Sequence, residues 1–143
     1  MIQITVEQYF LKYADEYKSE LHPQIIQNAV ILLDKVNKLI QAMQMDGIGM
    51  DLIPLRHSLV CFTSGWRPRK VNEATPGAAK FSLHISGEAI DLSDPDGSID
   101  EWCVSNTRIL RELGLFMEHP SATKGWCHVQ SKPPKSGRLI FYP

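Results

Sequence analysis

The chain has 143 residues, a length typical of a single domain. Its formal net charge of -1 at pH 7 lacks the basic excess of proteins that bind nucleic acids or membrane surfaces. Its 3 cysteines, an odd number, favour free thiols over a disulfide framework. The first residues lack the charged and apolar regions of a signal peptide. We therefore expect a monomer that is cytoplasmic when made and has no nucleic-acid or membrane partner.

Helical patterns dominate the first part of the chain. Thr5 and Gln8 have the spacing of a capping box, and apolar residues follow at helical intervals as far as Tyr17. Pro23 suits the first turn of a second helix, in which apolar residues occupy one broad face. Helical structure is therefore predicted over residues 5 to 45.

The second part of the chain predicts short strands and one further helix. Runs of β-branched and aromatic residues predict strands at 58–62, 88–92, 115–118, 126–130 and 138–142. The stretch 63–80 is rich in glycine, proline and charge, which predicts a long loop. Ser98 with Glu101 predicts a second capping box, which opens a helix that ends before Gly114.

This order of elements predicts an α+β fold in one domain, residues 1–143. The N-terminal helical part covers residues 1–50, and the part covering 57–143 forms a small antiparallel sheet. Loops of the length predicted here are often functional, so we expect the chemistry of the protein in the second part.

His84 and Asp91 form the first part of a candidate metal site. Gly87, between them, allows a sharp turn, and the strand that follows places Ala89 and Asp91 on one face. The alternate residues, Ile90 and Leu92, suit the core. Zinc accepts both imidazole nitrogen and carboxylate oxygen, so this turn and strand can present two ligands together.

His128 is the candidate third ligand. Strand alternation places Trp126 and His128 on one face and turns Cys127 away from it. Two histidines and one carboxylate leave a fourth position open, which is typical of a catalytic zinc site. The same residues also fit a metal-free domain in which the histidines only form hydrogen bonds, and the pattern alone leaves this alternative open.

Three segments carry a family resemblance. They are Ser64-Gly65-Trp66-Arg67, the run from Ser82 through His84 to Asp91, and Trp126-Cys127-His128. In this order they resemble the zinc D-alanyl-D-alanine carboxypeptidase/dipeptidase family, part of the lysostaphin, D-Ala-D-Ala and hedgehog group of metallopeptidases. The resemblance implies zinc on His84, Asp91 and His128, and hydrolysis of a peptide bond in peptidoglycan-type or D-Ala-D-Ala-containing peptides.

The resemblance also implies roles for two further side chains. Arg67 would hold a substrate carboxylate or stabilise the polarised carbonyl, since its guanidinium suits either task. Ser82 would hydrogen-bond the substrate or only shape the turn before His84. A chain without an export signal fits a phage-encoded member released to the cell wall by another route, or a cytoplasmic dipeptidase.

The sequence departs from the family at the general base. The usual positions hold Gly125 and Trp126 here. Glu118 is the predicted substitute, because its strand can pair with the strand of His128, and His119 is the alternative. The departure supports a second hypothesis, in which the domain binds zinc but has little or no turnover, as a cell-wall-binding or phage structural component.

Overall fold

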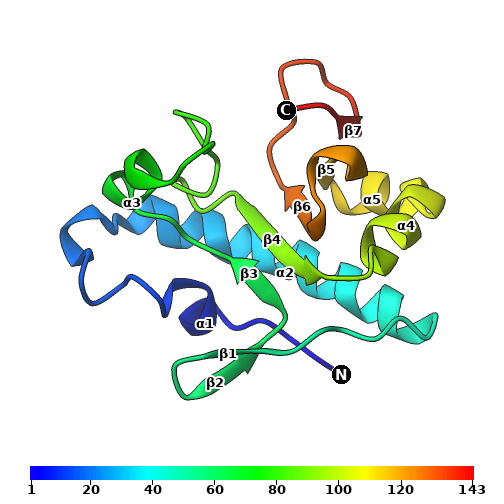
Figure 1. Cartoon of the computed structure of the whole chain (residues 1–143), viewed down its shortest axis with the longest axis horizontal. Helices are drawn as coiled ribbons and strands as arrows, with labels where there is room; N and C mark the ends of the chain where they lie inside the picture. Colours follow the sequence, from blue (N-terminus) through cyan, green and yellow to red (C-terminus); the bar gives the residue numbers. More distant parts are fainter.

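A five-stranded sheet backed by one long helix forms the centre of the molecule (Figure 1). The computed structural model describes residues 1–143. The sheet has the order β3-β4-β6-β5-β7, and a separate two-stranded sheet pairs β1 with β2. The helices are α1 (Val6–Phe10), α2 (Pro23–Met45), α3 (Arg69–Ala74), α4 (Ser98–Ser105) and α5 (Thr107–Leu113), with short 3-10 turns η1 (Lys18–Glu20) and η2 (Pro120–Ala122). The strands are β1 (Ile53–Leu55), β2 (Ser58–Val60), β3 (Phe62–Ser64), β4 (Ala89–Asp94), β5 (Phe116–Glu118), β6 (Gly125–Gln130) and β7 (Ile140–Phe141).

The predicted α+β fold is confirmed, with one change to the sheet. The pairs β3–β4, β4–β6 and β5–β6 are antiparallel, but β7 runs parallel to β5, so the sheet is mixed. A parallel neighbour requires a long connection, and the chain between β5 and β7, residues 119–139, provides it and contains β6.

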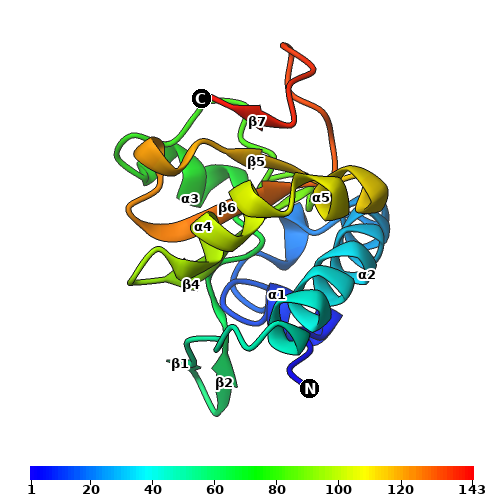
Figure 2. The ribbon, with the colours of Figure 1, turned by 90° about the vertical axis from the view of Figure 1, so that its right-hand side faces the viewer.

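Helix α2 packs its apolar face against one side of the sheet, as the side view shows (Figure 2). Seven of its side chains are buried and join residues of β4 and β6 in one hydrophobic core. The predicted start at Pro23 and the end before Asp46 are both confirmed. No helix combines the length and the hydropathy needed to cross a membrane.

The first predicted helix is shorter than its apolar pattern suggests. The capping box of Thr5 and Gln8 is present, but α1 ends at Phe10 and the chain continues in turns. The carbonyl of Tyr9 accepts the N–H of Trp66 at 3.3 Å, and the N–H of Tyr13 turns to Phe10 instead. A tertiary contact therefore takes the acceptor that the next helical turn would use.

Three other local predictions are wrong. Ser98 is not a cap, because the helix begins with it, and the Asp94 carboxylate instead accepts the N–H groups of Ile99 and Asp100, both at 2.9 Å. The helix is also interrupted at Asn106, whose side-chain amide donates to the carbonyl of Trp102. The predicted loop at 63–80 contains the end of β3 and the whole of α3.

Candidate zinc site

The register of two central strands places Asp91 opposite His128. Asp91 in β4 and His128 in β6 are paired residues of an antiparallel ladder, so their side chains project from the same face. His128 Nδ1 lies 2.8 Å from Asp91 Oδ1. Ile90 and Leu92 lie in the hydrophobic core, as strand alternation predicts.

His84 reaches the same point from an irregular segment between α3 and β4. Its Nε2 lies 3.2 Å from Asp91 Oδ2. The segment is pressed against α2: Gly87 has a φ of +78°, and a Cβ there would lie 2.6 Å from the carbonyl oxygen of Ile25. Asn28 of α2 also donates to the carbonyl of Ser86 at 3.0 Å. Close approach to the helix therefore requires glycine at position 87 and sets the position of His84.

The three side chains form one compact, buried cluster. Each offers a ligand atom, and these atoms all lie within 4.8 Å of one another. His84, Asp91 and His128 are only 3%, 9% and 7% exposed. Two imidazole nitrogens and one carboxylate oxygen are ligands that zinc accepts, and three protein ligands leave a position open. Cys127 is fully buried in the core.

Hydrogen bonds on the far side of each ring fix which nitrogen can bind a metal. His84 Nδ1 lies 2.8 Å from the carbonyl oxygen of Gly65. A carbonyl oxygen can only accept, so Nδ1 carries the proton and Nε2 is the nitrogen left to bind a metal. Gln130 Nε2 donates to the carbonyl of Lys132, which turns Gln130 Oε1 towards His128 Nε2 at 2.9 Å. His128 therefore presents Nδ1, so the ring nitrogen of each histidine that is left for a metal faces Asp91.

Asp91 and His128 shift one another's pKa values. Burial raises the pKa of Asp91, but the neighbouring charge of His84 and the hydrogen bonds from His128 and His84 outweigh it, and the net pKa lies well below the usual range. Burial lowers the pKa of His128, but its hydrogen bond to Asp91 and the charge of that carboxylate raise it overall. A metal ion bound at these atoms replaces a proton held between the two side chains.

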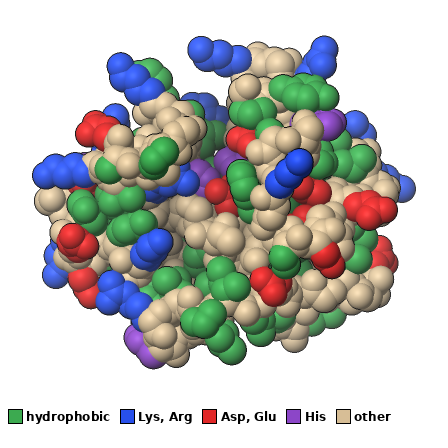
Figure 3. Space-filling model, in the orientation of Figure 1, with side chains coloured by type: hydrophobic (Ala, Val, Ile, Leu, Met, Phe, Trp, Pro, Cys, Tyr) green, Lys and Arg blue, Asp and Glu red, His purple; other side chains and the backbone are tan.

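A cavity of about 470 Å³ opens over the cluster. Figure 3 shows histidine side chains at the bottom of a cleft between two raised parts of the surface. One wall is the segment after α3, and the other comes from β5, β6 and the C-terminal end of the chain. The cavity lining includes, beside the cluster, the predicted site residues Arg67, Ser82 and Glu118, together with Trp126.

Arg67 is held in place without a carboxylate partner. Its Nη1 donates to Asn72 Oδ1 at 3.0 Å and its Nη2 to Ser64 Oγ at 3.1 Å. Asn72 is buried and donates in turn to the carbonyl of Ala79 at 2.9 Å. No ion pair involves Arg67, so the guanidinium faces the cavity with its charge unneutralised. Ser82 Oγ accepts the N–H of His84 at 3.2 Å and so shapes the turn.

The structure separates the two candidate bases. Glu118 lines the cavity, and its Oε1 lies 3.9 Å from His128 Nε2. Burial raises the pKa of Glu118, and the charge of His128 only partly opposes this. His119 lies outside the cavity lining, where its ring stacks on Tyr142 with centroids 4.5 Å apart and its Nδ1 contacts Ser121.

Sequence reasoning missed Gln130 and the carbonyl of Gly65, which orient the two histidines. Alternation along β6 carried a signal for Gln130, because residues 128 and 130 share a face of the strand. Nothing in the sequence marks the Gly65 carbonyl, since backbone groups leave no pattern.

Comparison with known proteins agrees with this geometry. Residues 24–130 match the Peptidase M15 family, which is well over half of the chain. No curated protein and no solved structure gives a significant match. The matched range contains all three residues of the cluster, whose chemistry fits the zinc of that family. The chain therefore belongs to the Peptidase M15 family of zinc metallopeptidases, with His84, Asp91 and His128 as its candidate zinc site.

Proposed function

We propose that this metallopeptidase hydrolyses an amide bond in peptidoglycan-type peptides, including those that end in D-Ala-D-Ala. The observation that carries the proposal is Arg67, an unpaired guanidinium that lines the same cavity as the candidate zinc site. Because Asn72 and Ser64 hold two of its nitrogens, the group is oriented before a substrate arrives. A guanidinium held in this way suits a carboxylate close to the scissile bond.

The residues of the cavity divide the work of hydrolysis. His84, Asp91 and His128 would hold a zinc ion, and that ion would supply the Lewis acidity that polarises a carbonyl oxygen and lowers the pKa of water to about 7. Arg67 binds the substrate carboxylate or the carbonyl oxygen and sets the position of the scissile bond. Glu118 takes a proton from the attacking water and gives it to the leaving amine. Ser82 keeps the turn that presents His84 and leaves its hydroxyl at the cavity wall.

The environment of Glu118 supports its proposed role. Its carboxylate is partly buried beside the cluster, and burial raises its pKa above the ordinary value. A general base works best when its pKa lies near the operating pH, so a raised pKa favours Glu118 over an exposed carboxylate.

The test combines zinc content and hydrolysis in one purified batch. We expect one zinc per chain and release of D-alanine from muropeptides that end in D-Ala-D-Ala. One zinc without cleavage of any intact or cross-linked peptide would favour the zinc-binding module without turnover. A chain that binds no zinc after reconstitution would contradict the site itself.

Glu118→Gln tests the base, with His119→Gln as the matched control. Glu118→Gln keeps the shape of the side chain but removes its basicity, so turnover should fall by about 10²- to 10⁴-fold while zinc stays bound. His119→Gln should change turnover little, because His119 does not line the cavity. Unchanged turnover in Glu118→Gln would remove Glu118 from the mechanism.

A further inference from the structure

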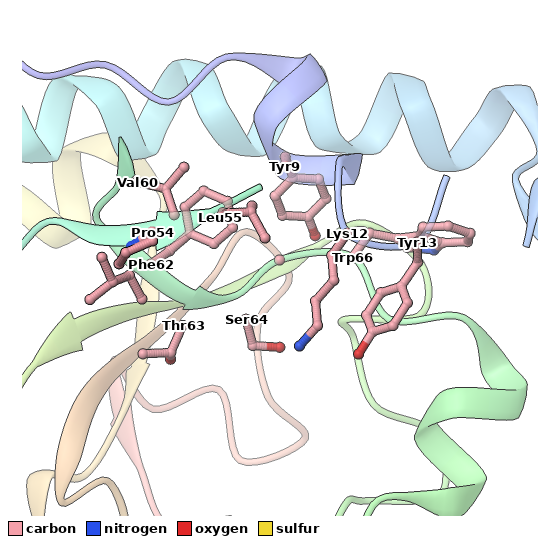
Figure 4. Close-up of a pocket in the computed structure, with 12 residues that line it drawn as sticks. Tyr9, Lys12, Tyr13, Pro54, Leu55, Val60, Phe62, Thr63, Ser64 and Trp66 are labelled. Carbon is pink, nitrogen blue, oxygen red and sulfur yellow. The ribbon is translucent and has the colours of Figure 1, made fainter. Parts of the chain in front are cut away.

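A second cavity lies at the open edge of the sheet, beside β3. Its volume is about 220 Å³, and its walls come from α1 and the turns after it, β1, β2 and the β3 region. More than half of its lining residues are hydrophobic, among them Phe62 and Trp66, which are almost fully buried (Figure 4). No Asp or Glu side chain lines this cavity. A mostly apolar cavity with a few polar groups is the usual form of a ligand site.

Three polar groups of this cavity lie together on one side. Figure 4 shows the side chains of Lys12, Tyr13 and Ser64 ending at the same side, with the Lys12 ammonium between the two hydroxyl groups. Lys12 Nζ lies 5.3 Å from the centre of the Tyr13 ring and has no carboxylate partner within ion-pair distance. One ammonium and two hydroxyl donors, with no acidic side chain around them, match a carboxylate.

Ser64 connects this cavity to the catalytic one. Its hydroxyl accepts a hydrogen bond from Arg67 at 3.1 Å, and Arg67 lines the catalytic cavity. Ser64 also lies opposite Asp91 in the β3–β4 ladder, one strand away from the candidate zinc site. Ser64 therefore lines the second cavity and contacts a residue of the catalytic cavity.

We propose that the cavity of Lys12, Tyr13 and Ser64 is a substrate subsite that binds a side-chain carboxylate of the peptide on the acyl side of the scissile bond. The proposal rests on the proposed peptidase function and adds a preference for acidic peptides. The aliphatic part of the acidic residue packs on the apolar wall, and its carboxylate meets Lys12. Because Lys12 is exposed, the gain is that of a solvent-exposed ion pair and weakens as salt increases.

The test uses pairs of pentapeptides that end in D-Ala-D-Ala and differ only by Glu or Gln at one of the first three residues. Affinities are measured by NMR titration of the zinc-loaded full chain carrying Glu118→Gln, which limits consumption of the peptide. We expect the Glu peptide of at least one pair to bind about threefold to fivefold more tightly, with shifts of the Tyr13 and Ser64 amides. Lys12→Met should abolish the preference, and Lys18→Met, which removes another exposed lysine outside the cavity, should preserve it.

The outcomes separate the subsite from the peptidase function. Equal affinity for Glu and Gln at every position, no binding of any peptide, or a preference that survives Lys12→Met would overturn the subsite. Hydrolysis by the wild-type chain is assayed separately on the same peptides. A preference that depends on Lys12, in a chain whose wild type cleaves none of them, would keep the subsite and contradict the proposed function.

Discussion

The ligands of the candidate zinc site rest on two different kinds of support. Asp91 and His128 stand on neighbouring central strands, and the ladder between β4 and β6 sets their separation. His84 stands on an irregular segment, where contacts with the Gly65 carbonyl, the Arg67 N–H and α2 replace the ladder. Strand positions are fixed by many repeated hydrogen bonds, whereas the loop position depends on a few individual contacts. The loop half of the site should therefore be the half that single substitutions disturb most.

Removal of any ligand should have the largest effect. His84→Ala, Asp91→Ala and His128→Ala should each lose stoichiometric zinc, because two remaining ligands do not hold the ion tightly. The measurement is elemental analysis after dialysis against trace zinc, with the exposed His57→Ala as a control. If His84→Ala alone kept full zinc, the strand pair would be sufficient and the comparison between the two supports would fail.

Gly87→Ala tests the contact between the loop and α2. The new Cβ would meet the Ile25 carbonyl at 2.6 Å in a backbone with φ +78°. We expect the free energy of unfolding to fall by about 2 to 5 kcal/mol, from left-handed strain and overpacking together. Gly77→Ala is the matched control, since its φ is +76° and a Cβ there meets nothing within 4 Å.

The control should lose only about 1 to 2 kcal/mol, the strain without the clash. Chemical denaturation of both variants measures the difference. Equal losses would show that the loop can move away from α2, and that His84 does not depend on this contact.

Gln130→Leu tests the support of the strand half. The substitution removes the acceptor that holds the proton on His128 Nε2, so zinc affinity should fall by about 10- to 100-fold. Gln130→Glu keeps an acceptor and should retain most of the affinity. Gln27→Leu, on the exposed side of α2, is the control for a general effect of the substitution.

The measurement is competition with a zinc chelator, which reports binding without turnover. An NMR assignment of the His128 tautomer in both Gln130 variants supplies a second reading. Unchanged zinc affinity in Gln130→Leu would show that the hydrogen bond to Gln130 is not needed, and that the strand ladder alone positions His128.

The same contrast explains how much the sequence could predict. Alternation along β4 correctly placed Ile90 and Leu92 in the core, and helical spacing predicted the apolar face of α2. The end of α1 was not predictable, because the contact between Tyr9 and Trp66 joins distant parts of the chain. The cap of α4 was misassigned because Asp94 performs it from inside β4. Local patterns thus predict the elements, while tertiary backbone contacts and side-chain caps decide where they begin and end.

Asp100 offers the smallest and most specific test, because it ties α4 to the residues that precede β6. Its Oδ2 accepts the hydroxyl of Thr123 at 3.0 Å, while its Oδ1 is buried without a hydrogen-bond partner. Burial raises the pKa of Asp100, and hydrogen bonds from Cys127 and Thr123 only partly oppose this. The carboxyl group is therefore easier to ionise in the unfolded chain than in the folded one.

A raised carboxyl pKa gives the folded state its full contribution below the unfolded pKa and removes it as pH rises through the folded value. Asp100→Asn cannot titrate, so its stability relative to the wild type should improve between about pH 4 and about pH 7. Denaturant unfolding at both pH values measures this change. A difference that stays constant with pH would show that Asp100 is equally easy to ionise in the folded and unfolded chain. Ionisation of Asp100 would then not destabilise the contact between α4 and Thr123.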